Sequence, residues 1–277
     1  LALRSAAVVV PDKRKADRRY DLLPHCGGED AYFFDDEAGF VGVADGVGGW
    51  ARHGVDAGRY SRQLMSLCAD AVRAGVNDPA AVLTEAHSRT SERGSSTALV
   101  VALLQARDKS ARLKAANLGD SGFLVLRQGR ILLQSTPQQH SFNFPFQLLA
   151  PNTHPNSDSP HDAEIFELEN VLPDDVIILG TDGLFDNMFP YEVSELMVSL
   201  SAAADQTPKG LAGLAARELA HKAAAFSRDA SRRSPFAVEA KKEGHWFHGG
   251  KVDDITVVVS VVIRDLGEEA KPLKSKL

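Results

Sequence analysis

The chain has 277 residues, of which 44% are apolar and 25% are charged, close to the averages for globular proteins, so a disordered, collagen-like or coiled-coil chain is excluded. The 31 basic and 37 acidic residues give a formal net charge of −6, which disfavours binding to the phosphate backbone of nucleic acids. Two cysteines are too few for a disulfide framework, and the longest apolar run, Ile255–Ile263, is about half the length of a membrane-spanning helix.

Short apolar runs bounded by turn residues predict a protein rich in β-strands. Gln128-Gly129 separates two of these runs by a connection short enough for a hairpin, and a hairpin requires antiparallel pairing. In chain order the predicted strands are Tyr32–Phe34, Phe40–Ala44, Thr97–Leu104, Leu113–Asn117, Phe123–Leu126, Ile131–Gln134, Ile165–Leu168, Val176–Leu179 and Ile255–Ile263.

Four segments have the spacing of helices, and they occur in pairs rather than singly between strands. In Ala57–Arg73 the residues Tyr60, Leu64, Cys68 and Ala71 recur on one helical face. The other three begin with proline, which is favourable in a first helical turn; they are Pro79–Arg89, Pro190–Leu200 and Pro208–Phe226. Because a doubly wound fold has single crossover helices, we expect antiparallel sheets layered with pairs of helices.

One long segment, Thr136–Asp162, shows neither pattern. It is rich in proline and contains His140, His154 and His161. Long irregular segments in compact domains are often functional or mobile. The sequence leaves two interpretations open, a flap over a site and a surface excursion.

Carboxylates stand at the ends of apolar strands in five places. A carboxylate close to a core is costly unless positive charge compensates it. No Arg or Lys lies within two residues of Asp45, Asp120 or Asp182. We therefore interpret these positions as ligands of a shared cation; the five clusters are Glu29-Asp30, Asp45, Asp120, Asp182 and Asp253-Asp254.

The types of donor in these clusters indicate the metal and the reaction. Carboxylate oxygens, a glycine carbonyl after Asp45 and no interleaved His or Cys favour Mg²⁺ or Mn²⁺ over zinc or copper. Two such ions are suited to phosphate ester hydrolysis, because they polarise phosphoryl oxygens and activate water. Ser121 in Gly-Asp-Ser-Gly is disfavoured as a nucleophile because the Gly-x-Ser-x-Gly elbow is absent. A nuclease with two metal ions is another hypothesis for the same ligands, and the acidic net charge of the chain disfavours it.

Six motifs carry a resemblance to a known family. They are Gly28-Glu29-Asp30, Val43–Gly49, Gly94–Ala98, Asn117–Gly122, Thr181–Asn187 and Gly250–Thr256. Their order over about Gly27–Val262 resembles that of the metal-dependent Ser/Thr protein phosphatases of type 2C. Three more segments look like the organellar branch of that family, which includes a mitochondrial phosphatase and plant plastid relatives; they are Gln138–His140, Pro145–Leu148 and Ser234–Ala237.

This resemblance implies a fold and an activity. The implied fold is α+β, a four-layer α-β-β-α sandwich of two antiparallel sheets flanked by pairs of helices. The implied activity is hydrolysis of phosphoserine and phosphothreonine by a hydroxide that bridges two Mg²⁺ or Mn²⁺ ions. By position, Asp45 would bridge both ions and Gly46 would bind one through its carbonyl, while Asp182 and Asp253 would complete the other shell. Asp45, Asp182 and Asp253 are thus the implied catalytic residues.

The remaining acids receive supporting roles from the same resemblance. Glu29 and Asp30 would reach a metal through water, and Asp120 matches a position associated with a third, weaker ion. Asp254 occupies a slot often filled by Asn. Because Asp253 and Asp254 are adjacent, which of them is the direct ligand stays open.

Two departures from the family pattern affect the expected mechanism. Val47 stands where many relatives have a histidine that is a proposed general acid, so protonation of the leaving group is unassigned; His140 and a metal-bound water are the options. His25 stands where relatives often have a phosphate-binding arginine, and Arg52 could substitute for it. These departures motivate an alternative function, a catalytically weak pseudophosphatase that binds phosphoproteins.

The sequence also suggests domain limits, partners and location. We expect an N-terminal arm over residues 1–24, which could be the remnant after a targeting segment, one catalytic domain over residues 25–264 and a polar tail over residues 265–277. The expected partners are phosphoprotein substrates, with no nucleic acid and no membrane span, and the chain is expected to be a monomer. The resemblance implies an organelle, either mitochondrion or chloroplast.

Overall fold

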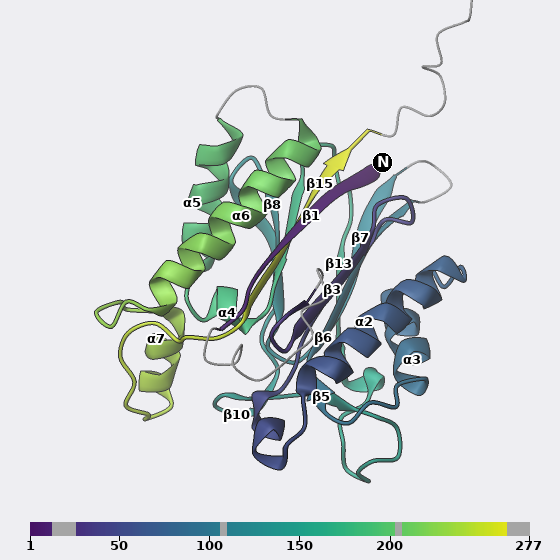
Figure 1. The fold of residues 1–277 in the computed structure, drawn as a ribbon. Coiled ribbons are helices and arrows are strands. Elements are labelled where there is room, and N and C mark those ends of the chain that lie inside the picture. The colour runs from purple at the N-terminus through teal and green to yellow at the C-terminus, as the bar shows by residue number, and fades with distance from the viewer. Residues whose placement is uncertain (13–25, 106–109, 203–206, 265–277) are drawn as a thin grey trace, which may run out of the picture.

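Two antiparallel β-sheets pack face to face, with helices on both outer faces (Figure 1). The computed structural model describes residues 1–12, 26–105, 110–202 and 207–264. One sheet has five strands and the other has six. The expected α+β sandwich of two antiparallel sheets flanked by helices is confirmed.

Every strand in the two large sheets pairs antiparallel with its neighbours. All nine strands predicted from apolar runs are present, with ends within two residues of the predicted ones. In spatial order the first sheet contains β1 (Ala2–Val10), β15 (Ile255–Ile263), β14 (Val176–Gly180), β8 (Gly122–Arg127) and β9 (Arg130–Gln134). The second contains β13 (Glu164–Leu168), β7 (Ala111–Leu118), β6 (Ala98–Gln105), β4 (Phe40–Asp45), β3 (Asp30–Asp35) and β2 (Cys26–Gly27).

Strand β1 corrects the predicted domain boundary. The sequence predicts an arm over residues 1–24, but Ala2–Val10 pairs with β15 along its whole length. Leu3 and Ser5 of β1 are buried, and the Ser5 hydroxyl lies 2.7 Å from that of Ser260 on β15. The strand escapes a pattern search because small and polar residues interrupt its apolar ones. Residues 13–25 and 265–277, which include half of the predicted arm and all of the predicted tail, lie outside the described residues.

The helices divide between the two outer faces. α2 (Ala57–Arg73) and α3 (Pro79–Ser88) pack on the six-stranded sheet, while α5 (Pro190–Ser201) and α6 (Pro208–Ser227) lie on the side of the five-stranded sheet (Figure 1). All four were predicted. The helical elements without a predicted counterpart have three to eight residues, too few to show a period clearly; they are η1 (Gly48–His53), η2 (Pro160–Asp162), α4 (Asp182–Phe185) and α7 (Pro235–Lys242).

Successive side chains of each strand point to opposite faces of its sheet, and this divides the core into three layers. On β4, Val41 and Val43 face the other sheet, whereas Phe40 and Ala44 face α2 and α3. The layer between α6 and the five-stranded sheet is built differently. There α6 presents small side chains, which let its backbone approach β1 and β15 closely; they are Ala212, Ala215, Ala216, Ala220 and Ala223.

The segment 136–162 is less irregular than predicted. It contains a small hairpin, β10 (Gln139–Ser141) and β11 (Phe144–Pro145), followed by β12 (Leu148–Leu149). Strand β12 pairs with β5 (Ser95–Ser96), and Ser96 in turn bridges to Gly46 after the end of β4. The segment is thereby attached beside the strand that ends at Asp45.

Two properties of the described residues bear on the other sequence-based expectations. Cys68 is buried on α2 and is not part of a disulfide. Among the described helices, none combines the length and the apolar character needed to cross a bilayer.

Helix α3 begins at an N-cap that also carries an ion pair. The Asp78 carboxylate accepts hydrogen bonds from the backbone N–H of Ala80 and Ala81, both at 3.1 Å, and contacts the Lys114 ammonium. Partial burial opposes ionisation, but the Lys114 contact and the two amides outweigh it and lower the pKa of Asp78. The cap and the ion pair therefore both require a charged Asp78.

Replacing Asp78 by Ala should lower the free energy of unfolding by about 1 kcal/mol at pH 7. Because folding lowers the pKa of Asp78, its contribution is present above the unfolded pKa and is lost as the pH falls through the folded pKa. The difference between wild type and Asp78→Ala should therefore shrink between pH 7 and pH 3, measured by urea denaturation. Asp70→Ala, which removes an exposed pair with Arg73, is the matched control. A difference that does not change with pH would contradict this account.

Candidate active site

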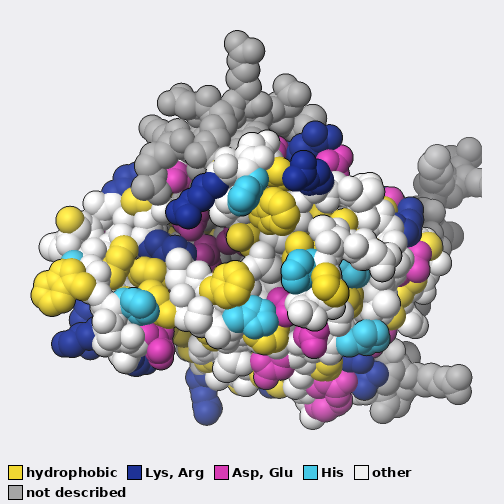
Figure 2. Space-filling view, turned by 90° about the horizontal axis from the view of Figure 1, so that it is seen from below, with side chains coloured by type: hydrophobic (Ala, Val, Ile, Leu, Met, Phe, Trp, Pro, Cys, Tyr) yellow, Lys and Arg dark blue, Asp and Glu magenta, His cyan; other side chains and the backbone are white. Residues whose placement is uncertain are grey.

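The acidic residues that the sequence singles out lie where strands end, at one end of the sandwich. Asp30 at the start of β3 stands directly opposite Asp45 at the end of β4. Strand β14 ends at Gly180, which pairs with Gly122 of β8 and Val257 of β15, so the chain around Asp182 lies near both neighbouring turns. Figure 2 looks onto this end and shows acidic side chains recessed in a hollow bordered by hydrophobic and basic ones.

Lys251 joins the acids on the side of the five-stranded sheet. Its ammonium contacts the Asp182 carboxylate and lies 2.7 Å from Asp186 Oδ2 and 3.5 Å from Asp253 Oδ2. Its backbone is held by Asn187, whose side-chain amide donates to the Lys251 carbonyl at 2.8 Å and accepts from its N–H at 2.9 Å. The position of the ammonium is therefore determined by the residues that follow β14.

This contact corrects one step of the sequence-based reasoning. The lack of a basic residue near Asp182 in the sequence suggested that a bound cation alone compensates it. Lys251, 69 positions away, supplies part of that charge. Lys251 and Asp186 are not among the predicted site residues, although both lie inside motifs that carry the family resemblance. Two features could have found them: the carboxylate four positions after Asp182, and the lysine two positions before Asp253.

The group carries more negative than positive charge. Burial raises the pKa of Asp120, and the neighbouring Asp182 charge raises it further. Burial also raises the pKa of Asp186, although Lys251 opposes the shift. Burial alone would lower the pKa of Lys251, but the charges of Asp182, Asp186 and Asp253 outweigh this and raise it. One ammonium thus faces several carboxylates, and additional positive charge would be favourable here.

On the side of the six-stranded sheet, buried hydroxyls position the acids. Thr97 Oγ1 accepts from the Asp45 N–H at 3.0 Å and lies 2.7 Å from Ser121 Oγ, next to Asp120. The turn before Ser121 is narrow: Gly119 has φ +104°, and a Cβ there would lie 2.7 Å from the Thr97 methyl group. Ser121 is therefore buried in this turn, with its hydroxyl bonded to Thr97.

The pair Glu29-Asp30 connects both sheets. The Glu29 carbonyl accepts from the Gly46 N–H at 3.1 Å and from Ser61 Oγ at 2.5 Å. Asp30 Oδ2 accepts from Thr181 Oγ1 at 2.9 Å, directly beside Asp182. Both acids are buried, and Asp30 is tied to the residue that precedes Asp182.

Asp253 and Asp254 point to different partners. Asp254 is 1% exposed, and its two oxygens accept from the backbone N–H groups of Asp12 at 2.7 Å and Glu29 at 2.9 Å. Gly28 has φ +67°, and a Cβ there would lie 2.2 Å from Asp254 Oδ1. Asp253 instead faces Lys251. The structure thus places Asp253 with Asp182 and uses Asp254 to hold the turn before β3.

Three other predicted residues are not brought into the carboxylate group. Arg52 is exposed on η1, and His25 lies outside the described residues. His140 lies in β10, where its Nε2 is 3.0 Å from the Asp158 carboxylate and its ring stacks on Phe146. The arginine that does lie against the Glu29 turn is Arg62, which donates to the Gly28 carbonyl at 3.2 Å and pairs with Asp56 at 2.9 Å.

The residues fit a hard, hydrated cation. Asp182 Oδ1 is buried and has no hydrogen-bond partner among the described residues, as expected for an oxygen that binds a metal. Within the described part of the chain, no three His, Cys, Asp or Glu side chains stand close enough to hold one ion together. Mg²⁺ binds through oxygen, usually keeps several waters and takes one or two carboxylates, so a carboxylate oxygen such as Asp182 Oδ1 is a suitable donor.

The different partners of Asp253 and Asp254 generate a test. Asp254→Ala should lower the free energy of unfolding by about 3 kcal/mol, because two buried N–H groups lose a charged acceptor. Asp253→Ala, the matched control, should lower it clearly less. The measurement is guanidinium denaturation with a chelator present. Equal losses in the two variants would show that the assignment is wrong.

Comparisons with known proteins show which family the chain belongs to. The family model for stage II sporulation protein E (SpoIIE) matches residues 35–260. An Arabidopsis thaliana protein named "Probable protein phosphatase 2C 80" is 47% identical over 249 residues, which cover 87% of this chain and 57% of that protein. The chain spans 50–57% of the length of this protein and two other plant relatives.

Solved structures share the fold. The photosystem II phosphatase PBCP is 32% identical with a TM-score of 0.79, and the match covers 94% of this chain and 98% of that one. The catalytic domain of the serine/threonine phosphatase PstP, solved with two manganese ions, has a TM-score of 0.59 at 18% identity, covers 95% of this chain and 99% of its own, and shows the fold alone. On these matches and the strand-end carboxylates, the chain belongs to the type 2C protein phosphatase family.

Proposed function

We propose that the chain hydrolyses phosphoserine and phosphothreonine in proteins, with two Mg²⁺ or Mn²⁺ ions bound at the strand ends. The observation that carries this proposal is the unpartnered Oδ1 of Asp182 inside a group of carboxylates with surplus negative charge. Membership of a phosphatase family supports the choice of reaction. The alternative, a phosphoprotein-binding pseudophosphatase, gains no support from the comparisons.

The proposed roles of the residues combine the family resemblance with the contacts described above. Asp45, the Gly46 carbonyl, Asp182 and Asp253 would hold the two ions, and Asp120 is the proposed ligand of a third, weaker one. Bound ions would neutralise phosphoryl oxygens and lower the pKa of water at this end of the sandwich. The buried Glu29 and Asp30 would bind through water, whereas Asp254 keeps their turn in place.

The chain's own residues limit how substrate is held and released. Val47 has no proton donor in its side chain, and His140 is engaged with Asp158. The residue that protonates the leaving alkoxide is therefore still to be assigned. Arg52, exposed on η1 shortly after Asp45-Gly46, and His25 are the proposed phosphate-binding residues.

The expected partners and location are also proposals. Phosphoproteins are the proposed substrates of a monomeric catalytic domain. The similarity to a photosystem II phosphatase supports residence in an organelle, with the chloroplast and the mitochondrion as the two candidates.

Asp45→Asn is the direct test of the proposed activity. Removing this charge should lower kcat/KM for a phosphothreonine peptide by at least about 100-fold, because it would weaken the charge stabilisation that the metals supply. Turnover is measured as phosphate release with Mn²⁺, and chelation should abolish it reversibly. Asp70→Asn is the control on an exposed helix position. No metal-dependent turnover by the wild type would reject the proposal.

Lys251→Met tests how the internal ammonium and a metal share the same carboxylates. With a chelator, the variant should be about 3 kcal/mol less stable than wild type, because buried carboxylates lose their counter-charge. Added Mn²⁺ should raise the melting temperature more in the variant than in wild type, since the ammonium no longer competes for Asp182. Thermal melts with and without Mn²⁺ measure both effects. An identical Mn²⁺-induced shift in the two proteins would contradict the competition.

A further inference from the structure

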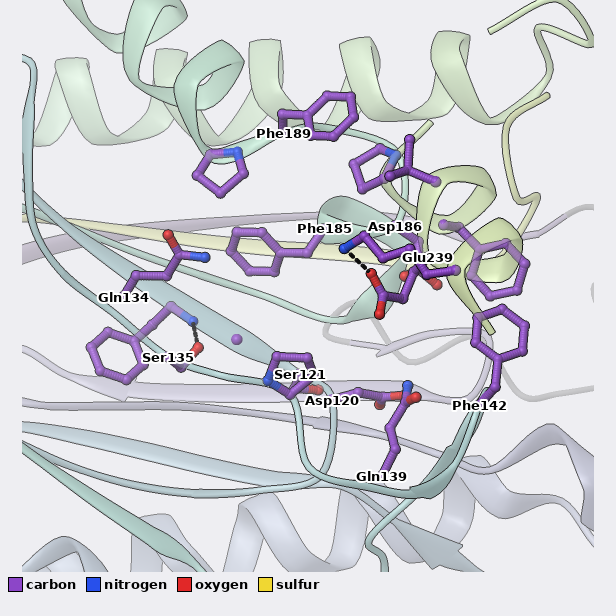
Figure 3. Close-up of a pocket in the computed structure, with 18 residues that line it drawn as sticks. Asp120, Ser121, Gln134, Ser135, Gln139, Phe142, Phe185, Asp186, Phe189 and Glu239 are labelled. Atoms are coloured by element: carbon purple, nitrogen blue, oxygen red, sulfur yellow. Dashed lines mark hydrogen bonds and ion pairs between the residues drawn. The ribbon is translucent and has the colours of Figure 1, made fainter. Parts of the chain in front are cut away.

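A pocket lined with aromatic side chains lies beside the carboxylate group. It is half open, has a volume of about 530 Å³ and has five phenylalanines in its walls. Phe123 is buried, but the other four are only half-buried, so one pocket leaves several large apolar rings partly in water. Exposed apolar surface that is concentrated in a concavity marks a binding site. The five are Phe123, Phe142, Phe185, Phe189 and Phe236 (Figure 3).

Four separate segments build these walls, and Phe123 comes from the buried strand β8. Phe142, at the tip of the β10–β11 hairpin, packs against Phe236 with ring centroids 5.0 Å apart and stacks on His245 at 4.8 Å. Phe185 belongs to α4, and Phe189 precedes α5, where it stacks on Tyr191. The aromatic walls are therefore set by packing between elements far apart in the sequence.

The pocket and the proposed active site share a wall. Asp120 and Asp186 line the pocket, and both belong to the group around Lys251. The Phe236 N–H donates to the Asp186 carbonyl at 3.1 Å, and the Lys251 ammonium lies 5.0 Å from the centre of the Phe236 ring. In Figure 3, Asp120 and Ser121 lie across the cavity from Phe185 and Phe189. A molecule bound at the carboxylates could thus extend into the pocket.

We propose that this pocket binds an apolar side chain, aromatic or branched, of the phosphorylated protein substrate. This inference rests on the proposed phosphatase function and specifies its substrate class. An extended peptide advances about 3.3–3.6 Å per residue, so the side chain would belong to a residue within about three positions of the phosphorylated one. The carboxylates of Asp120 and Asp186 on the shared wall disfavour an acidic side chain in the same place.

The composition of the rim agrees with an apolar occupant. Lys242 donates to Glu239 Oε2 at 2.6 Å, so the two charged residues at the rim compensate each other. No unpaired basic side chain is recorded among the described lining residues to attract a second phosphate. Shape and aromatic contact would therefore decide which substrate side chain the pocket prefers. Aromatic walls favour contact with apolar groups and other rings over charged groups.

The test compares phosphothreonine peptides that differ at one position. A series carries Phe, Ala or Glu at each of the three positions on either side of the phosphothreonine, and kcat/KM is measured by phosphate release with Mn²⁺. Wild type should prefer Phe at one position by at least about tenfold over Ala and more over Glu. Phe142→Ala and Phe189→Ala should lose this preference. Phe144→Ala, an exposed residue of the same hairpin that does not line the pocket, should retain it.

A small substrate separates this inference from the proposed function. N-acetyl phosphothreonine amide has no flanking side chains, so wild type and all three variants should hydrolyse it equally. If the peptides are hydrolysed without preference for Phe, the pocket proposal is wrong and the proposed function stands. If nothing is hydrolysed, the proposed function is wrong. In that case fluorescence anisotropy of the Phe and Ala peptides still decides the pocket proposal, because equal affinities would reject it.

Discussion

The constraint that organises this structure is the repulsion among carboxylates gathered at one end of a β-sandwich. Asp182, Asp186 and Asp253 contact a single ammonium, that of Lys251, and burial raises the pKa of Asp186 despite that contact. Such a group is stable only with positive charge nearby. The lysine supplies part of it, and the proposed metal ions would supply the rest, so the feature that limits stability is also the one that suits phosphate chemistry.

The sandwich provides the rigidity that this arrangement requires. Strands buried on both faces end together, and hydroxyl groups link the ends across elements, as Thr97 does between β4 and the turn before β8. Thr181 connects the two sheets by donating to Asp30. These short contacts leave the acids little freedom to move apart. The Phe-rich pocket is built on the same scaffold, since Phe185 and Asp186 are consecutive residues after β14.

Much of the fold could be read from local pattern. Long strands such as β15 and helices such as α2 show their period within their own residues, and glycine-rich motifs marked where the acids stand. The edge strand β1 could not be read in this way, because its role depends on pairing with β15 at the other end of the chain. The short helix α7 is too brief to show a period, although its first residues carry part of the pocket.

Sequence alone therefore determined the strand-end carboxylates and the antiparallel layers, and it predicts a hard cation, because these depend on residue type and on spacing within a few positions. Only the tertiary structure decided which acid meets which partner. It brought Lys251 to Asp182 across 69 positions and placed the Asp254 carboxylate against backbone amides rather than in the carboxylate group. It also assembled phenylalanines from four segments into one pocket. These are contacts between distant segments, and their geometry exists only after the two sheets have packed.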